Sequence, residues 1–508
     1  MQKRRLVINA FMSVVQLIVN AIILFLLYKF ILRMIGVDKL GIWSMVMAIT
    51  SLSRFGDLGI SSSVVKYVAK YLAQGKEFMI SSVIETSVIS IGLFIGLLSA
   101  LFYYFAPWLL SFIIPNDSIG IALSILPYAL ISLWITSVSG VFQNALDGLQ
   151  KIYIKAIILT GGTILNFIIC LIFVPVHGIM ALAYAQLIQS ICVAFFTWYF
   201  LKQNILLLPY FSYKWNKRAF KEMISYGINA QIAFIVGILC DPVTKGLLSR
   251  FGGLSTVGYY EMASRIVTQF RAIITTANQA LVPAIAELQE NNKEYIKTVY
   301  KESYRLLIFI AIPSFFLLIS LTPYISQILI GHTEQEFIFF SIALSIAFMI
   351  NTLNIPAYNT NLGIGYLRWN TISLIVMATL NIITGYILGH FFKETGVLIG
   401  WCISVICSGF IVIISFHIGN KISFKNLFPP EILFNIISNI AGLLISFKIY
   451  NSYYNYNHKH IFAILITTLF MIILIISFYT YPDRNRILEF TRRELISFKS
   501  PPVQNFDK

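Results

Sequence analysis

Long apolar runs separated by short polar breaks recur along the whole chain, and they constrain its fold more than any other feature. A helix needs about 20 predominantly apolar residues to cross a bilayer. Runs of about that length lie near residues 6–32, 39–63, 78–105, 119–146, 152–174, 178–201, 222–249, 254–283, 303–323, 335–361, 368–391, 396–419, 431–450 and 460–481. Only 11% of the chain is charged, against about 25% in soluble domains. We therefore expect an all-α polytopic membrane protein with about 14 transmembrane helices.

The first apolar run follows three basic residues, Lys3, Arg4 and Arg5, and is about 27 residues long. The apolar core of a cleavable signal peptide has only about 7–15 residues and ends at a small-residue cleavage site. We therefore expect this run to be retained as the first transmembrane helix.

Lysine and arginine residues are concentrated in every second predicted loop. If the N-terminus is cytoplasmic, an even number of helices returns the C-terminus to the same side, and the loops on that side are the basic ones. They hold Lys66, Lys70, Lys76, Lys151, Lys155, Lys202, Lys214, Lys217, Arg218, Lys221, Lys293, Lys297, Lys301, Arg305, Arg368, Lys421 and Lys425, and the tail adds Arg484, Arg486, Arg492, Arg493, Lys499 and Lys508. The opposite loops, such as 115–118 and 331–336, are much poorer in basic residues. This positive-inside pattern predicts cytoplasmic termini, and it explains the net charge of +16 without a nucleic-acid partner.

Motifs for catalysis or metal binding are absent from the sequence. The five cysteines all fall inside predicted helices without metal-ligand spacing, and the six histidines form no HxxxH pattern. There is no GxxxxGK[ST] phosphate-binding loop and no Ser/His/Asp constellation. No soluble domain interrupts the helices. We therefore predict a transporter rather than an enzyme, without a metal or other cofactor.

The two halves of the apolar region repeat each other at a nearly constant shift. GVDKLGIWSM at 36–45 aligns with GLSTVGYYEM at 253–262, and NALDGL at 144–149 aligns with NTNLGI at 359–364. The matched pairs at a shift of 217 are Arg33 with Arg250, Gly36 with Gly253, Gly41 with Gly258, Met45 with Met262 and Arg54 with Arg271; those at 215 are Asn144 with Asn359, Gly148 with Gly363 and Asn166 with Asn381. Each half holds six predicted helices, and because six is even, both copies have the same orientation in the membrane.

This repeat predicts two parallel six-helix lobes around a central cavity, followed by two helices without a repeat partner. An axis along the membrane normal relates lobes of this kind. We assign residues 1–205 to the N-terminal lobe, 206–425 to the C-terminal lobe, 426–485 to the two additional helices and 486–508 to a basic cytoplasmic tail.

Charged side chains occur inside predicted helices, where an ionised group costs roughly 2.5–3.5 kcal/mol at mid-bilayer. They are Arg54, Asp57, Asp241, Lys245, Glu261, Arg265 and Arg271. Spacings of three or four residues allow three pairs to meet on one helix face: Arg54 with Asp57, Asp241 with Lys245, and Glu261 with Arg265. Two interpretations remain open for each pair: an ion pair that helps the lobes to pack, or a group that lines the cavity.

Arg271 differs from the other charged residues because no acidic residue lies three or four positions away. It lies 17 residues beyond Leu254 (271 minus 254), where its helix is predicted to begin, and its repeat partner Arg54 lies at the same depth. We expect the two guanidinium groups to face one another across the cavity, an arrangement that suits an anionic headgroup.

Three further polar features each allow a structural and a functional interpretation. Pro242, next to Asp241, either marks a substrate or gating region or is a tolerated helix kink. In the structural interpretation, Asn144 and Asn359 are helix-terminating residues. In the functional interpretation, their side-chain amides contact sugars. The stretch 64–76 suits an amphipathic helix at the inner interface, with its lysines towards lipid phosphates.

The segment LGIWSMVMAITSLSRFGDLGISSSVVKYVAKYLAQGK at 40–76 resembles the N-terminal signature of the polysaccharide-transporter (Wzx-type) branch of the multidrug/oligosaccharidyl-lipid/polysaccharide (MOP) exporter superfamily. The matching positions are Gly41, Trp43, Asp57, Gly59, Lys66, Tyr67 and Ala69. The resemblance extends to the two six-helix lobes plus two helices, and so covers nearly the whole chain.

This resemblance implies a flippase that moves undecaprenyl-diphosphate-linked oligosaccharide repeat units, of the O-antigen (lipopolysaccharide) or capsule type, across the bacterial inner membrane by alternating access. It implies a cationic cavity, and the candidate cations are Arg54, Lys245, Arg265 and Arg271. Asp57, Asp241 and Glu261 are expected to balance these cations or to couple transport to H⁺ or Na⁺. We expect a monomer in contact with membrane lipids, with other polysaccharide-assembly membrane proteins as candidate partners.

Three alternatives remain open. Lipid II flippases are related, but they typically carry a Ser-Arg…Gly…Arg-Asp run in helix 1, where this chain has KRRLVINAFMSVVQLIVN. The multidrug branch relies on acidic cavity residues that bind Na⁺ or H⁺; Asp241 keeps this alternative open, although the basic excess disfavours cationic drugs. Polysaccharide polymerases are also polytopic but carry a large outer loop, and the longest outer loop here is only the region around 106–118.

Overall fold

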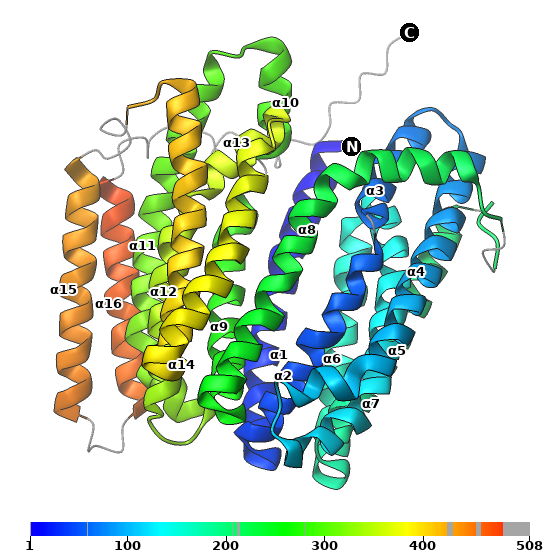
Figure 1. Cartoon of the computed structure of the whole chain (residues 1–508). Helices are drawn as coiled ribbons and strands as arrows, with labels where there is room; N and C mark the ends of the chain where they lie inside the picture. Colours follow the sequence, from blue (N-terminus) through cyan, green and yellow to red (C-terminus); the bar gives the residue numbers. More distant parts are fainter. Residues whose placement is uncertain are drawn as a thin grey trace.

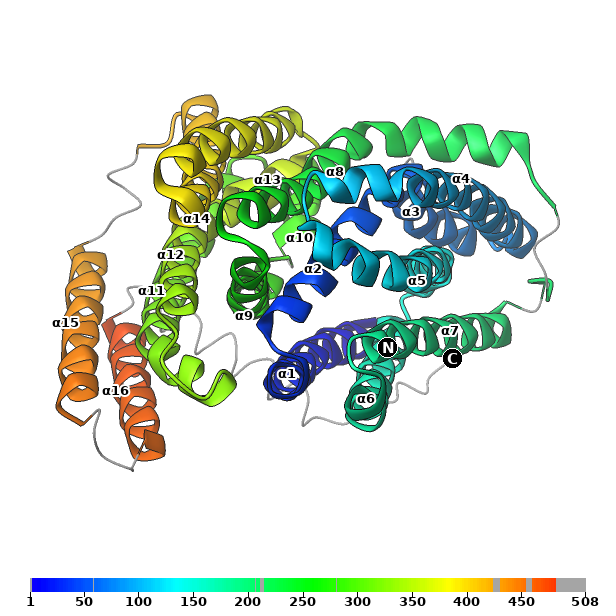
Figure 2. The same cartoon turned by 60° about the horizontal axis from the view of Figure 1, so that its bottom comes forward.

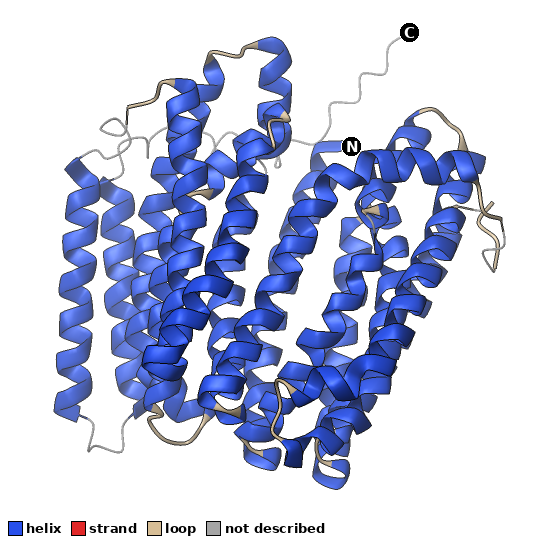
Figure 3. Cartoon of the chain, viewed as in Figure 1, coloured by secondary structure: helices blue, strands red, loops and turns tan. Residues whose placement is uncertain are grey.

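The computed structural model describes residues 2–57, 59–205, 207–210, 214–279, 281–423, 430–453 and 459–480. Within these ranges the chain forms helices and loops and no strand (Figure 3). Within the described residues, each of the fourteen predicted apolar segments is mostly helical, so the all-α polytopic fold class is confirmed. The predicted basic tail at 486–508 lies outside the described residues, and the lobe boundaries stay predictions.

The first half of the chain forms α1 (Gln2–Ile35), α2 (Val37–Ser51), the 3-10 helix η1 (Leu52–Asp57), α3 (Ile60–Ala73), α4 (Glu77–Ser111), α5 (Asn116–Gly148), α6 (Ile152–His177) and α7 (Met180–Asn204). The predicted segment 39–63 is therefore divided among α2, η1 and the beginning of α3. As expected for an amphipathic helix, α3 buries Val64 and Val68 while Lys66 and Lys70 are exposed.

The second half forms α8 (Lys217–Gly252), α9 (Leu254–Asn278), α10 (Leu281–Asn291), α11 (Tyr295–Leu329), α12 (Gln335–Thr352), α13 (Ile355–Ile364), α14 (Arg368–Asn420), α15 (Pro430–Tyr453) and α16 (Lys459–Thr480). The long α14 is two helices that meet at non-helical residues Phe392 and Lys393, as the separate predicted segments 368–391 and 396–419 require. The first turns of α8 pack against α3 and α4 of the first half, and α8 then descends beside α9 (Figure 1).

The internal repeat is visible in the backbone. Gly36 precedes α2 with φ 82° and ψ 171°, and Gly253 precedes α9 with φ 88° and ψ −176°. Residues with a side chain rarely adopt this positive φ, so each helix start requires glycine. The two starts are separated by the predicted shift of 217 (253 minus 36). The duplicated sequence thus folds into the same helix junction twice.

Side-chain packing follows the same repeat. A Cβ on Gly148 of α5 would lie 2.8 Å from Val68 Cβ and 2.9 Å from the Val65 carbonyl oxygen of α3. A Cβ on its repeat partner Gly363 would lie 2.7 Å from Ile285 Cβ and 2.9 Å from the Val282 carbonyl oxygen of α10. Both glycines let a short helix approach closely, and the contacted residues are themselves related by the shift of 217.

The two halves pack tightly where α1 ends and α2 begins, a region that we call the Gly36 end of the bundle. There α2 crosses α9, and glycines of the repeat lie at the crossing. A Cβ on Gly258 would lie 2.5 Å from the Val37 carbonyl oxygen, and a Cβ on Gly41 would overlap the carbonyl oxygen of Leu254. The largest buried apolar cluster extends across this contact, with residues of α1, α2 and α5 packed against α9, α11 and α12.

The last two described helices, α15 and α16, stand at one edge of the molecule beside α11, away from α6 and α7 (Figure 2). Of the described helices, nine are long and apolar enough to cross a membrane by length and composition alone. The nine include α14 as a single segment, whereas α9, which carries Glu261, Arg265 and Arg271, is not among them. The structure therefore supports a multi-pass membrane protein, in which α9 packs against α1, α2, α8, α11 and α12.

Candidate functional site

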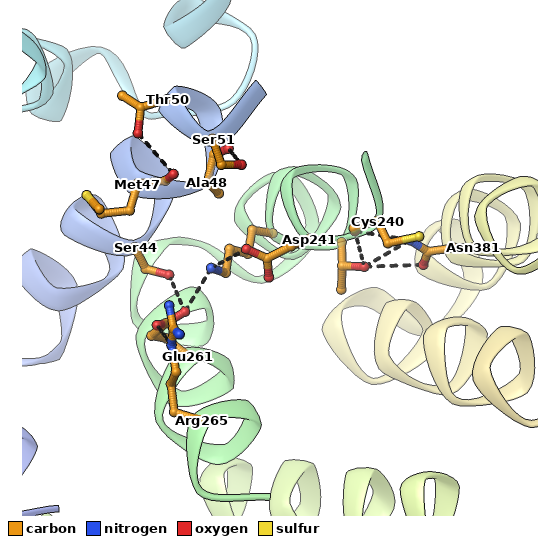
Figure 4. A network of polar contacts seen from close by, with 12 residues as sticks. Ser44, Met47, Ala48, Thr50, Ser51, Cys240, Asp241, Glu261, Arg265 and Asn381 are labelled. Carbon is orange, nitrogen blue, oxygen red and sulfur yellow. Dashed lines mark hydrogen bonds and ion pairs between the residues drawn. The ribbon is translucent and has the colours of Figure 1, made fainter. Parts of the chain in front are cut away.

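A buried carboxylate on α9, Glu261, joins the two halves of the molecule. It accepts a hydrogen bond from Tyr28 Oη of α1 at 3.1 Å. It accepts another from Ser44 Oγ of α2 at 2.8 Å (Figure 4). It also forms ion pairs with Lys245 Nζ of α8 at 2.8 Å and with Arg265 Nε of its own helix at 2.7 Å. Glu261 is only 6% exposed, so these four donors replace the water that a carboxylate would otherwise need.

The ion pairs continue from Lys245 to Asp241, whose Oδ2 lies 2.7 Å from the ammonium nitrogen. Asp241, Lys245, Glu261 and Arg265 therefore form a chain of alternating charges with no net charge. The predicted pairs at four-residue spacing are confirmed. The link between Lys245 and Glu261 was not predicted, because it joins two helices and spacing within one helix gives no sign of it.

The two halves of the chain contribute different residue types to this polar network at equivalent positions of the repeat. Ser44 is the repeat partner of Glu261 and Tyr28 is the repeat partner of Lys245, each at the shift of 217. Sequence analysis did not single out Tyr28 or Ser44, although the repeat alignment places both opposite charged residues. Each half thus contributes the same two positions, filled by hydroxyls in the first half and by charges in the second.

Arg54 and Asp57 do not form the predicted pair. They lie in η1 rather than in an α-helix, and in the described part of the chain no ion pair joins them. Asp57 Oδ1 instead accepts a hydrogen bond from the Ser61 backbone N–H at 2.9 Å, an interaction that caps the first turn of α3. The predicted ion pair does not form because the Asp57 carboxylate is turned towards the first turn of α3, where it binds the Ser61 N–H instead of the guanidinium.

Arg271 is held within its own half of the molecule. Its Nη2 donates to Asn351 Oδ1 at 2.7 Å and its Nε donates to Thr352 Oγ1 at 3.2 Å. Its guanidinium lies 5.1 Å from the Phe348 ring centroid. No acidic side chain pairs with it among the described residues, as the spacing predicted.

Two pockets contain residues of the predicted site. The first, of about 220 Å³, lies among α1, α2, α6 and α7, and Glu261 and Arg265 reach it from α9. Three amide side chains line it: Asn166, Gln186 and Gln189. We call it the α1/α6 pocket.

The second pocket, of about 350 Å³, lies among α9, α12, α13 and α14 and contains Arg271 and Asn359. We call it the Arg271 pocket. Arg54 is not among its lining residues. The structure therefore does not bring Arg54 and Arg271 together in this pocket, contrary to the predicted arginine pair facing one another.

Asn144 and Asn359 make equivalent hydrogen bonds. Asn144 Nδ2 donates to the Ser61 carbonyl oxygen at 2.9 Å, and Asn359 Nδ2 donates to the Asn278 carbonyl oxygen at 2.9 Å. Ser61 and Asn278 are related by the shift of 217. Each amide ties α5 or α13 to the point where α3 begins or α9 ends, which gives both residues a structural role. Sugar contact by either amide stays a prediction, and only Asn359 lines the Arg271 pocket.

We predict that Asn144→Leu and Asn359→Leu each lower the free energy of unfolding by about 1–3 kcal/mol, because each leaves a backbone carbonyl without its partner. The two losses should be similar, since the two contacts are repeats. Asn420→Leu is the control, because the Asn420 amide bonds only its own helix at Phe416. Denaturant unfolding of the purified variants measures the difference, and a loss at Asn420 as large as the other two would contradict the assignment.

Pro242 lies inside the continuous helix α8, which has no non-helical residue there, as a tolerated proline does; a gating role stays a prediction. Beside the proline, Asn381 of α14 donates through Nδ2 to the Cys240 carbonyl oxygen at 3.3 Å and to Thr244 Oγ1 at 3.0 Å. This buried amide joins α8 to α14 (Figure 4). Its repeat partner Asn166 instead lines the α1/α6 pocket.

Comparison with known folds places this architecture among membrane transporters. The lipid II flippase MurJ, in an inward closed conformation, superimposes with a TM-score of 0.73 at 16% identity, over 95% of this chain and 100% of that chain. An inward-facing multidrug resistance MATE family transporter of the MOP superfamily gives 0.69 at 17% identity, over 80% and 98% of the two chains. An outward-facing conformation of a MATE transporter of the same superfamily gives 0.58 at 16% identity, over 81% and 95%. At these identities the likeness concerns the fold.

Sequence comparison identifies the family. An uncharacterized membrane protein of Methanocaldococcus jannaschii is 22% identical over 352 residues, which are 66% of this chain and 68% of that protein. A family model described as "Polysaccharide biosynthesis protein" matches residues 30–338, more than half of the chain. The match includes the segment 40–76 that carries the resemblance to polysaccharide transporters. The chain belongs to this polysaccharide biosynthesis family and has the fold of the MOP superfamily, as its sequence motif predicted.

Proposed function

We propose that the protein is a flippase that moves undecaprenyl-diphosphate-linked oligosaccharide units, of the O-antigen or capsule type, across the bacterial inner membrane. Both termini are cytoplasmic in this proposal, and the Gly36 end faces outward. The family supports a role in polysaccharide biosynthesis, and the fold supports transport rather than catalysis.

One observation carries the proposal: paired and unpaired charges lie at different depths. Glu261 is 7 residues and Arg271 is 17 residues from the first residue of α9, Leu254, or about 10 Å and 25 Å along the helix axis. The neutral network around Glu261 thus lies near the Gly36 end, where the halves are packed together. Arg271, which has no acidic partner among the described residues, and Arg54, which forms no ion pair with Asp57 there, lie deeper, where an anionic cargo would arrive from the opposite face.

This arrangement supports an inward-facing state. The Gly36 end is closed by the crossing of α2 and α9 and by the hydroxyls of Tyr28 and Ser44 on Glu261. The higher TM-score against an inward-facing MATE transporter than against an outward-facing one agrees with it. In the proposed cycle, cargo binds from the cytoplasmic leaflet, the inner end closes, and the contacts at the Gly36 end break to release it.

The acidic groups of the network are the proposed coupling site. Asp241 is bound to buried Lys245, yet its side chain is 49% exposed. Protonation or Na⁺ binding at Asp241 would remove one counter-charge from Lys245 and so weaken the neutral network. We therefore propose H⁺ or Na⁺ coupling through Asp241, with Glu261 holding the two halves together.

Lipid II transport is the second candidate function, favoured by the likeness to MurJ over 95% of this chain. The two candidates differ in cargo rather than in mechanism, because both cargoes carry a diphosphate on a prenyl chain. The sequence of helix 1 lacks the arginine and aspartate pattern expected of lipid II flippases, and for this reason we place the oligosaccharide unit first.

We expect the purified protein, reconstituted in vesicles with undecaprenyl-diphosphate-linked oligosaccharide, to expose the sugar to an impermeant glycosidase on the opposite face. The Arg54→Ala/Arg271→Ala double variant should lower this rate by about tenfold or more, since each guanidinium contributes charge-assisted hydrogen bonds of roughly 1.5–3 kcal/mol. Arg250→Ala is the control, because Arg250 contacts only aromatic rings among the described residues. Wild-type flipping by the double variant would disprove the residue assignment, and flipping of lipid II alone would establish the second function.

A further inference from the structure

We propose that the Arg271 pocket binds a single sugar ring bearing one carboxylate, such as a uronic acid, within the cargo. This inference rests on the proposed function and makes it more specific, because it names which part of the cargo enters which pocket. The carboxylate would lie on Arg271, and the ring would lie against the aromatic wall of the pocket.

The positive charge of the Arg271 pocket favours an anion that carries a single negative charge. Arg271 is the single charged residue among its lining residues. A guanidinium has five N–H donors. Asn351 and Thr352 use two of them, which leaves three. One cation with a free planar fork matches one carboxylate, whereas a diphosphate would bring a second negative charge into the pocket without a partner, at a high cost.

The remaining walls suit a carbohydrate rather than an inorganic anion. Aromatic rings of Phe348, Tyr358 and Trp401 line the pocket, and rings of this kind present apolar faces to the C–H face of a sugar. Trp401 is 9% exposed, and its Nε1–H has no hydrogen-bond partner in the described structure.

Amides supply the donors and acceptors that hydroxyl groups require. Asn354 lines the pocket and is 8% exposed, and its side chain makes no hydrogen bond within the described structure. Asn359 uses Nδ2 on a backbone carbonyl, and its Oδ1 has no described partner. Gln279 lines the pocket from the end of α9 and is exposed. Asn354, Asn359 and Gln279 therefore line the same pocket as the Arg271 guanidinium and the three aromatic rings.

The size of the pocket limits what enters it. Its volume of about 350 Å³ is at the lower end of the range for small-molecule sites, about 300–1,000 Å³. One ring of the repeat unit fits this range better than the whole oligosaccharide. The diphosphate and the remaining sugars would therefore stay outside the Arg271 pocket, nearer to Arg54 and the lipid.

Saturation-transfer NMR on the full-length protein in lipid nanodiscs tests the inference with methyl β-D-glucuronide as the probe. We expect transfer to the ring protons in the wild type, and at least about tenfold weaker binding in Arg271→Gln, since a charge-assisted contact is lost. Methyl β-D-glucoside should bind correspondingly more weakly to the wild type. Arg250→Gln is the matched control and should bind the glucuronide as the wild type does.

Arg271→Lys covers the case in which the glutamine variant does not fold. It keeps the charge but loses the planar fork, so glucuronide binding should fall while remaining stronger than glucoside binding. Equal binding of glucoside and glucuronide to the wild type would overturn the inference. So would the absence of any transfer, or displacement of the glucuronide by pyrophosphate at lower concentration than by free glucuronate.

The flipping assay separates this inference from the proposed function. If the wild type flips lipid-linked oligosaccharide but does not bind the glucuronide, the uronate pocket is wrong and the flippase stands. If it binds the glucuronide through Arg271 but flips no lipid-linked oligosaccharide, the flippase is wrong and the pocket stands. Arg54→Gln should retain glucuronide binding while lowering flipping, because Arg54 does not line the pocket.

Discussion

Replacing Glu261 by glutamine is expected to lower the free energy of unfolding by about 3–5 kcal/mol, the usual cost of breaking a buried ion pair. The loss arises mainly at Lys245, whose side chain is only 3% exposed and would keep only the half-exposed Asp241 as a counter-charge. Arg265 is 54% exposed and lines the α1/α6 pocket, so it is less buried and contributes less. Thermal and denaturant unfolding of the purified protein would measure the loss.

A double variant distinguishes loss of the charge pair from general damage. Lys245→Met/Glu261→Gln should recover most of the stability lost in Glu261→Gln, because it removes the buried cation together with its counter-charge. Asp241 then loses Lys245, but its side chain is half exposed rather than buried. Additive losses in the double variant would show that the two residues do not act as a pair.

The exposed ion pair of Arg218 and Glu222 is the matched control. It has the same four-residue spacing on a helix as Asp241 with Lys245, but its side chains are 88% and 37% exposed. Exposed pairs of this kind contribute at most about 1 kcal/mol. If Glu222→Gln cost as much as Glu261→Gln, burial would not be the reason for the expected effect.

The second large effect is expected at the glycines of the α2/α9 crossing. Gly41→Ala and Gly258→Ala place a methyl group against the backbone of the opposite helix at the Gly36 end. Overpacking of this kind costs about 1–3 kcal/mol or more, so the closed Gly36 end should lose a factor of roughly 5–150 in population. Transport should fall because the closed state is part of every cycle.

This opening can be measured as the distance between two spin labels. One label is placed at position 39, before the crossing in the first half, and the other at position 332, after α11 in the second half. Both variants should give longer distances than the wild type. Gly161→Ala is the control, because a Cβ on Gly161 meets nothing within 4 Å. It should leave the distances unchanged and slightly favour the helix. Wild-type distances in Gly41→Ala would contradict the proposed crossing contact.

These two predictions depend on contacts that the repeat indicates only in part. Gly41 and Gly258 were paired by sequence, but nothing in the sequence placed them against one another. A sequence repeat shows which positions in the two halves are equivalent. It does not show which equivalent positions are in contact, because contact requires that both lie at the interface where the two halves meet. The contact of Ser44 with Glu261, two residues separated by the repeat shift of 217, is the clearest example.

Local spacing predicted charge pairs well only where the backbone is α-helical. Asp241 with Lys245 and Glu261 with Arg265 lie on regular helices, and both pairs form. Arg54 with Asp57 lies in η1, where the chain passes from α2 to α3, and there the carboxylate caps α3 instead. The hydrogen bond from the Ser61 N–H to Asp57, which the hydrophobic pattern does not indicate, takes the place of the ion pair.

The sequence by itself determined the membrane fold, the helical segments and the duplication, because hydrophobic length and glycine positions act locally along the chain. It also determined that Arg271 has no acidic neighbour on its helix. Only the tertiary structure decided that Lys245 pairs with Glu261, that Asn144 and Asn359 bind backbone carbonyls, and that Arg271 lies in a pocket without Arg54. Those contacts join helices far apart in the chain, and their partners depend on how whole helices cross rather than on spacing within one of them.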